Sequence, residues 1–191
     1  MRPRNLAALI RYLRLRVRCP RFRARPFFIG PRSTFDVSDD ADVTIGRRLT
    51  LLRDFDGRFK GELVIGDDVW FSPGCTLAVH ESVSIGSNCV FAEYVSIHDN
   101  NHAESALAEP LAARGFETGP IRIGRNVWVG AKATILKGVT IGDNAIVGAN
   151  SVVTRDVPAG VTVAGAPARE LGPASAHDAR PVGAGAPASG T

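Results

Sequence analysis

The sequence predicts an all-β solenoid of short strands, and three observations support that fold class. Branched aliphatic residues recur at every sixth position along much of the chain. Small or branched residues recur four positions after each of them, a pattern that neither the period of a single strand nor that of a helix explains. Glycine and asparagine stand between these positions, where tight turns need them. Three six-residue segments then make one triangular coil, and stacked coils share a core.

Length and composition agree with a single soluble unit. The chain has 191 residues, of which 45% are hydrophobic and 22% are charged. These values are typical of a globular domain that buries a substantial core. Its cysteines, Cys19, Cys75 and Cys89, lack the paired spacing of a disulfide framework or a structural zinc site. We therefore expect a cytoplasmic protein.

The first element is a basic segment, residues 1–32, which holds ten arginines and no acidic residue. Apolar residues recur there at helical spacing, so we expect a short amphipathic helix that ends before Pro20. This helix either lies on an anionic membrane surface or packs its apolar stripe on the main domain. Nucleic-acid binding is not expected, because no aromatic platform or groove-reading motif accompanies the charge. The stripe consists of Leu6, Ile10, Leu13 and Val17.

The next elements are the first coils of the solenoid. Ile-Gly pairs recur every 20 residues, which corresponds to one 18-residue coil with two residues added at a corner. Ile45 is expected to open the stack. The two coils that follow place Ile65, Phe71 and Leu77, and then Ile85, Phe91 and Ile97, in the core.

Residues 98–120 interrupt the six-residue period. This stretch lacks regularly spaced aliphatic residues, so we expect a loop extruded from the solenoid. Long loops on rigid scaffolds often carry function, which makes this segment the first place to look for a site.

The closing coils begin at Ile123 and read IGRNVW, VGAKAT, ILKGVT, IGDNAI, VGANSV and VTRDVP. After Pro158 the repeat fades, AGAPAREL forms a closing segment, and residues 172–191 are expected to be disordered because they are rich in Ala, Gly, Pro and Ser. The chain thus divides into a basic segment (1–32), a solenoid domain (33–171) and a tail (172–191).

Residues 43–171 resemble the hexapeptide-repeat acyltransferases, and most closely their sugar O-acetyltransferase branch, which includes galactoside, maltose and colanic-acid acetyltransferases. The stretch IGRNVWVGAKATILKGVTIGDNAIVGANSVVTRDVPAGVTVAGAPARE is similar to the closing coils of that family at nearly every position. The resemblance implies a left-handed parallel β-helix and a homotrimer. It also implies transfer of an acetyl group from acetyl-CoA to a sugar or glycan hydroxyl, with no metal required.

The resemblance implies His102 as the general base, because family members carry their catalytic histidine five residues after the aliphatic position that Ile97 occupies here. His98 is the alternative base. Acetyl-CoA is already an activated thioester, so one imidazole that accepts the hydroxyl proton suffices. Asp99 or Glu93 is a candidate to orient that imidazole, although both also suit a solvated surface.

The resemblance also implies a set of coenzyme A contacts. Small side chains permit backbone contacts to the pantetheine arm, and two arginines suit the phosphate groups. At Gly172 the chain departs from relatives that carry a further basic residue there. The implied contacts are Trp128, Ala131, Ala149, Thr154, Arg155 and Arg169.

The acceptor positions differ from those of galactoside acetyltransferases. Ser72 and His80 stand where those enzymes carry Asn and Asp, so a different acceptor is expected, with His98 as a further contact. Cys75 and Cys89 fall on the inward fifth position and are expected to be small core residues rather than nucleophiles.

Two other functions remain open from the sequence. In a γ-class carbonic anhydrase, His80, His98 and His102 would supply three zinc nitrogens across a trimer interface. A non-enzymatic trimeric scaffold is the second alternative, because the fold alone does not determine function. The closing segments VVTRDVP and GAPAR favour the coenzyme A enzyme.

Overall fold

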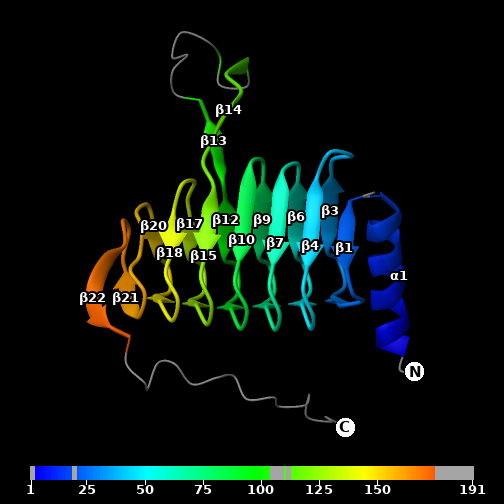
Figure 1. Cartoon of the computed structure of the whole chain (residues 1–191), viewed down its shortest axis with the longest axis horizontal. Helices are drawn as coiled ribbons and strands as arrows, with labels where there is room; N and C mark the ends of the chain where they lie inside the picture. The colour runs from blue at the N-terminus through cyan, green and yellow to red at the C-terminus, as the bar shows by residue number, and fades with distance from the viewer. Residues whose placement is uncertain (1–2, 19–20, 104–109, 111–112, 175–191) are drawn as a thin grey trace.

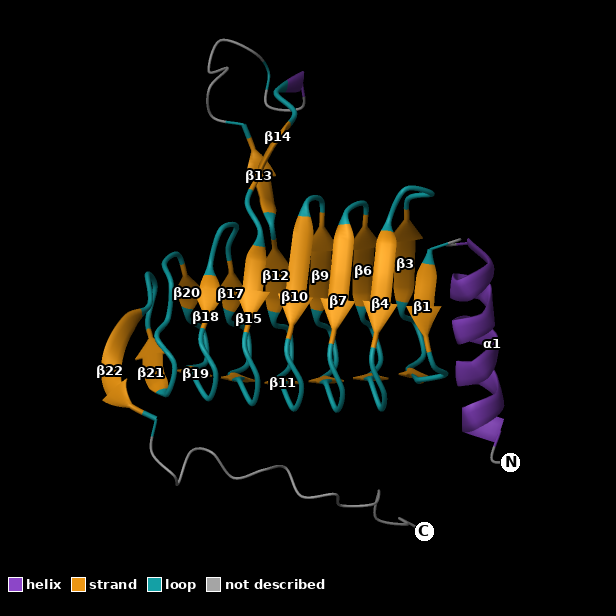
Figure 2. Ribbon diagram, viewed as in Figure 1, coloured by secondary structure: helices purple, strands orange, loops and turns teal. Residues whose placement is uncertain are grey.

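A computed structural model describes residues 3–18, 21–103, 110 and 113–174 of the chain. Three sheets form the sides of a solenoid, one helix lies across its N-terminal end, and a two-stranded hairpin projects from its middle (Figures 1 and 2). The strands of successive coils pair in parallel. The predicted all-β solenoid is confirmed.

Each coil contributes one strand to each of three sheets, named A, B and C in the order in which the chain meets them. The turns from B to C form the B–C edge of the solenoid, and the turns from C to the next A strand form the C–A edge. Sheet A consists of β1 (Phe22–Ala24), β4 (Asp42–Ile45), β7 (Glu62–Ile65), β10 (Ser82–Ile85), β15 (Ile121–Ile123) and β18 (Thr140–Ile141). Sheet B consists of β2 (Phe28–Ile29), β5 (Thr50–Leu51), β8 (Trp70–Phe71), β11 (Val90–Phe91), β16 (Trp128–Val129), β19 (Ile146–Val147), β21 (Val161–Ala164) and β22 (Arg169–Pro173). Sheet C consists of β3 (Thr34–Val37), β6 (Asp56–Phe59), β9 (Thr76–Val79), β12 (Ser96–His98), β17 (Thr134–Ile135) and β20 (Val152–Val153).

The core is a stack of equivalent side chains from successive coils. Ile97 lies directly beside Ile135 in the register of sheet C, and both are fully buried. The rings of Phe71 and Phe91 stack with centroids 4.4 Å apart. Cys75 is fully buried, like Cys89, and burial raises the pKa of both thiols to about 11. The predicted inward positions are therefore confirmed, and the two thiols are core groups.

Asparagine residues in the turns have a conformational role. Asn88, Asn126 and Asn144 occupy the same turn of successive coils with positive φ angles of 63°, 56° and 60°. Asparagine tolerates this left-handed region better than most residues. The amide of Asn126 also donates to the side-chain oxygen of Asn144 at 2.8 Å. These residues build the corner.

The stack opens one coil earlier than Ile45, so that prediction is wrong. Strands β1, β2 and β3 pair with β4, β5 and β6 in parallel, which gives a coil that begins at Phe22. Phe22, Phe27 and Ile29 fill its interior. Because aromatic residues replace the spaced aliphatic ones, the six-residue period does not reveal this coil.

Helix α1 (Pro3–Arg18) covers the open end of that first coil. Tyr12 is only 2% exposed, donates its hydroxyl to the carbonyl oxygen of Ala24 at 2.9 Å, and contacts the ring of Phe27. Ala8 is buried beside it. No helix among the described residues has the length and apolar character needed to cross a bilayer.

The helix packs on the domain, but not through the predicted stripe, which is a second correction. Helix α1 has two apolar sides, and the sequence pattern predicted only the outer one. The side that holds Tyr12 packs on the coil, because an aromatic ring with a hydroxyl can cover the phenylalanines and also bond a free carbonyl. The outward side chains are Leu6, Ile10, Leu13 and Val17, which are 53%, 44%, 49% and 84% exposed.

The predicted extruded loop begins as a hairpin at the C–A edge. Strands β13 (Asn100–His102) and β14 (Phe116–Thr118) pair antiparallel and project away from the coils (Figure 1). The amide of Gly119 donates to the carbonyl of Asp99 at 2.9 Å. An ion pair of 3.5 Å joins Lys137 to Glu117. Both contacts hold the base of the hairpin on the solenoid.

The far C-terminus lies outside the described residues from residue 175 onward, and so do residues 104–109 and 111–112 of the loop. Strand β22 runs antiparallel to β21 and closes the last coil of sheet B. Gly172 and Pro173, which were assigned to the tail, belong to this strand.

Candidate active site

Asp99 lies at the root of the hairpin and is fully buried. Its carboxylate accepts hydrogen bonds from the backbone amides of His80 and Glu81, at 2.7 and 2.8 Å, and from the side-chain amide of Asn100 at 3.3 Å. These bonds tie the turn after β9 to the start of the hairpin. The side-chain bonds of Asp99 thus hold backbone, which differs from the predicted contact with an imidazole.

Glu93, the other predicted orienting group, is exposed in the B–C edge, where its carbonyl accepts a bond from the amide of Lys132. Strands of sheet C separate it from the hairpin. The chain therefore does not bring Glu93 to His102.

His102 is exposed at the outer end of β13 and stands opposite Phe116 in the hairpin register. The two ring centroids lie 4.7 Å apart, and the ring of His80 meets Phe116 edge-on at 4.8 Å. Phe116 therefore contacts both imidazoles. No sequence signal points to Phe116, because no repeat passes through the loop and the partner of Phe116 depends on the hairpin register.

His98 ends β12 and is half-buried beneath this group. Burial, and then the positive charge of Arg58, lower the pKa of His98, whereas the negative charge of Asp99 opposes the shift. Burial and the charge of Lys60 likewise lower the pKa of His80. Both imidazoles are therefore neutral near neutral pH.

The cluster offers an exposed imidazole beside an aromatic face and two neutral imidazoles. Such a group can accept a proton from a bound hydroxyl, and the ring of Phe116 can cover the apolar face of a sugar. No three His, Cys, Asp or Glu side chains gather in a metal-binding arrangement anywhere in the described part of the chain.

A second region of small residues follows the B–C edge. Ala131 and Ala149 come after neighbouring strands of sheet B, and the amide of Asn150 donates to the carbonyl of Ala131 at 2.9 Å. A Cβ atom on Gly130 would lie 2.6 Å from the amide nitrogen of Ala149. Only glycine permits this close approach of two coils, so Gly130, Ala131 and Ala149 form a strip of small residues on this edge.

Comparison with known proteins identifies the family. The family described as hexapeptide repeat of succinyl-transferase matches residues 120–155. A protein of Escherichia coli K12 named as a lipopolysaccharide biosynthesis O-acetyl transferase is 33% identical over 143 residues, which cover 70% of this chain and 72% of that protein. The chain belongs to the hexapeptide-repeat acyltransferase family. It is an acyltransferase.

Two further relatives are named as acetyltransferases. The galactoside O-acetyltransferase of Escherichia coli K12 is 36% identical over 114 residues, which cover 59% of this chain but only 55% of that protein. A hexapeptide-repeat acetyltransferase from Vibrio cholerae, solved in complex with acetyl-CoA, has a TM-score of 0.60 and 28% identity, and covers 68% of this chain and 70% of that one. The fold is the left-handed parallel β-helix implied by the resemblance.

The predicted site residues of this acyltransferase fall on two different edges of the solenoid. His80, His98 and His102 meet at the C–A edge, where Thr154 and Arg155 also lie exposed in a later coil. Ser72, Ala131 and Ala149 lie in turns of the B–C edge. Arg169 is exposed and is the first residue of β22. The side chain of Trp128 is 44% exposed on sheet B. One chain therefore does not bring Ser72 to the histidines.

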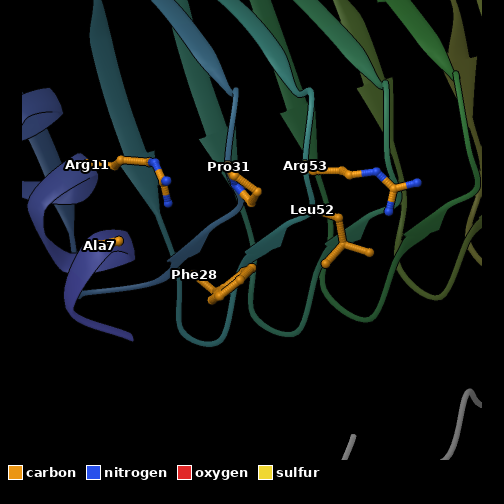
Figure 3. Close-up of a pocket in the computed structure, with 6 residues that line it drawn as sticks. All are labelled: Ala7, Arg11, Phe28, Pro31, Leu52 and Arg53. Atoms are coloured by element: carbon orange, nitrogen blue, oxygen red, sulfur yellow. The ribbon is translucent and has the colours of Figure 1, made fainter. Parts of the chain in front are cut away.

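At the N-terminal end of the B–C edge, a hollow of about 390 Å³ lies between α1 and the first coils (Figure 3). None of the predicted site residues lines it. Its lining is mostly apolar, with two arginines, and consists of Ala7, Arg11, Phe28, Pro31, Leu52 and Arg53.

Proposed function

We propose that this acyltransferase transfers the acetyl group of acetyl-CoA to a hydroxyl group of a sugar or glycan. The observation that carries the proposal is the exposed imidazole of His102, held on the hairpin against Phe116. The name of the solved relative in complex with acetyl-CoA supports the donor, and the names of the galactoside and lipopolysaccharide relatives support the acceptor class.

In this mechanism, His102 accepts the proton of the acceptor hydroxyl while the oxygen attacks the thioester carbonyl carbon. The tetrahedral intermediate then collapses, the carbon–sulfur bond breaks, and the imidazolium returns its proton to the leaving thiolate. The products are an acetyl ester and coenzyme A. Phe116 orients the imidazole from one side, and no covalent enzyme intermediate is needed because the donor is already activated.

We assign the acceptor contacts to His80 and His98 beside the base, and to Ser72 of a neighbouring chain. The two histidines remain neutral near neutral pH, so they can donate or accept hydrogen bonds to hydroxyl groups without attracting an anion. Arg155 and Arg169 are assigned to the phosphate groups of coenzyme A, because both guanidinium groups are exposed.

We further propose that the enzyme is a homotrimer in the cytoplasm. The two groups of site residues lie on opposite edges of sheet C, so packing one chain beside the next would bring both together at each interface. A cytoplasmic location fits the supply of acetyl-CoA and the free buried thiols Cys75 and Cys89.

Neither alternative function has a specific observation in its favour. The relatives are named as acetyltransferases, and none of those compared above is named as a carbonic anhydrase or as a scaffold. Acetyl transfer therefore remains the single proposal.

The test is the substitution His102→Ala, assayed as release of free thiol from acetyl-CoA with a panel of sugars and glycosides. We expect a fall of about 10²- to 10⁴-fold in kcat, with little change in the Kd for acetyl-CoA, because the base acts in the transition state. His98→Ala is the matched control and should cost much less. Wild-type turnover in His102→Ala would contradict the assignment of the base, and a wild-type enzyme inactive on every acceptor would contradict the reaction.

A further inference from the structure

Helix α1 presents an apolar row that the solenoid does not cover. At about 3.6 residues per turn, Leu6, Ile10, Leu13 and Val17 lie along one side of the helix, and Tyr12 points from roughly the opposite side into the first coil. All four side chains of the row are exposed, Val17 at 84%. A helix that needed only to cover the coil would have no use for this second apolar side.

Arginine side chains border the row. Arg14 is exposed and lines a shallow surface hollow together with Ile10, Leu13 and Val17. On the other side of the row, Arg16 is exposed and donates to the hydroxyl of Tyr12 at 3.2 Å. Apolar side chains flanked by guanidinium groups are typical of helices that lie in the surface of an anionic bilayer.

The charge around the helix is free to act on a partner. Exposed arginines continue beyond it at Arg21 and Arg25. Among the described residues, Arg14, Arg21 and Arg25 form no ion pair. With ten arginines and no acidic residue in positions 1–32, the segment that contains the helix is strongly positive. If a second copy of the chain packed on the same row, two positively charged segments would face and repel each other. The charge therefore favours an anionic partner.

The position of the helix suits a flat partner. Figure 1 shows α1 as the last element at the N-terminal end of the solenoid, with its axis across the stack. Its uncovered side thus faces away from the coils. The histidine cluster lies three coils further along sheet C, roughly 25 Å away at about 4.8 Å per coil and about 10 Å for the helix. A surface that contacts α1 leaves the cluster open.

We propose that α1 docks this protein on an anionic lipid bilayer. Leu6, Ile10, Leu13 and Val17 enter the interface between headgroups and acyl chains, while Arg14, Arg21 and Arg25 contact lipid phosphates. The solenoid then stands on the membrane, with its hairpin exposed to water. This location goes beyond acetyl transfer and does not depend on it.

Sedimentation of the full-length protein with vesicles tests the proposal. The wild-type chain should pellet with vesicles that contain about 30% phosphatidylglycerol and not with pure phosphatidylcholine, and salt should weaken the binding because it screens the arginines. The variant I10Q/L13Q/V17Q should lose binding at least tenfold, since each substituted side chain is exposed and does not support the fold. The variant R14Q/R21Q/R25Q should lose the preference for anionic vesicles.

Matched controls separate the surface from general effects. Leu171→Gln removes an exposed leucine from β22, and Arg122→Gln removes an exposed arginine from sheet A, so both should bind like the wild type. Circular dichroism confirms that all variants fold. Wild-type protein that stays in the supernatant overturns the proposal, and so does undiminished binding of I10Q/L13Q/V17Q. Self-association that the same substitutions abolish, without vesicle binding, assigns the row to a second copy and also overturns it.

Discussion

At the scale of single residues, Asp99 determines the geometry of the site without facing it. A buried carboxylate that lacked partners would cost several kcal/mol, so its bonds to the amides of His80 and Glu81 are required for the fold. Those bonds fix the turn after β9 against the hairpin root. His80 therefore reaches Phe116 because a backbone segment is held, rather than through a bond to its own ring.

The lowered pKa of His98 predicts a pH-dependent stability. The unfolded chain binds a proton near the ordinary histidine value of 6.5, whereas the folded chain resists it, so stability falls as the pH drops through and below that value. We expect the melting temperature of the wild type to fall between about pH 7.5 and about pH 5.5, and to fall less in His98→Asn.

The aspartates with lowered pKa, such as Asp67 and Asp143, lose their contribution only below their ordinary value of 3.8, outside this window. Differential scanning fluorimetry measures the melting temperatures of both proteins at both pH values. The difference between the two proteins at the higher pH gives the effect of packing lost in His98→Asn, which is subtracted from the difference at the lower pH. Equal slopes in the two proteins would show that His98 does not cause the effect.

The positions of the candidate site residues could be predicted where they follow the repeat and not where the chain leaves it. The family resemblance assigns His102 through its distance from Ile97, which is counted along a regular coil, and it assigns Ser72, Ala131 and Ala149 in the same way; their roles stay predictions. Phe116 was missed, because its contact with His102 arises from antiparallel pairing within an irregular loop. The bonds of Asp99 to backbone amides were also missed, since a sequence shows a carboxylate but not which backbone groups of the neighbouring coil pack against it.

At the scale of elements, strands as short as β17 (Thr134–Ile135) persist because they pair on both sides. Only the two ends of the stack lack a parallel neighbour. Strand β22 closes one end by folding back on β21, and α1 closes the other by covering Phe22 and Phe27 with Tyr12. End elements are therefore expected to matter for stability more than their size implies.

The role of α1 as an end cover predicts a graded set of stability changes. Tyr12→Ala should lower the free energy of unfolding by about 3–5 kcal/mol, because it leaves a cavity over the phenylalanines. Tyr12→Phe should cost only about 1 kcal/mol, for the lost bond to the carbonyl of Ala24. Leu13→Ala, one position along and exposed, should change it by less than about 0.5 kcal/mol.

Urea denaturation followed by circular dichroism measures all three, in the absence of lipid. If Leu13→Ala destabilises the protein as much as Tyr12→Ala, the outer row is buried against another part of the protein, and the described orientation of the helix is wrong.

The elements were predictable to different degrees for a physical reason. Coils from Ile65 onward follow from the period, because identical positions in successive coils must hold similar side chains to stack. The first coil escaped this logic, since one of its faces meets α1 rather than another coil and aromatic residues suit that contact. The helix was predicted, but a periodic pattern cannot tell which of two apolar sides is buried.

At the scale of the whole molecule, the triangular cross-section separates the two groups of candidate site residues, which are the two halves of the proposed site. The histidine cluster and hairpin lie at the C–A edge, and the strip of small residues that includes Ala131 and Ala149 lies at the B–C edge. Sheet C stands between them. A ring of chains in which the C–A edge of one meets the B–C edge of the next would unite the halves at every interface, and three such contacts close a ring.

Assembly of this kind predicts a particle of about 61 kDa by light scattering, three times the chain mass of 20.3 kDa.

A site shared between chains also predicts that two inactive variants restore activity when they assemble together. His102→Ala lacks the base, and Ala149→Trp fills the strip at an exposed position without disturbing the core. When equal amounts are coexpressed and assemble at random, about three quarters of the trimers are mixed, and each mixed trimer has one site of three with both an intact histidine and an intact strip, so about a quarter of the wild-type rate should return. Native mass spectrometry verifies that mixed trimers form, and each variant alone is the control. Mixed trimers without activity would mean that each site lies within one chain, and a monomer of 20.3 kDa would remove the shared site altogether.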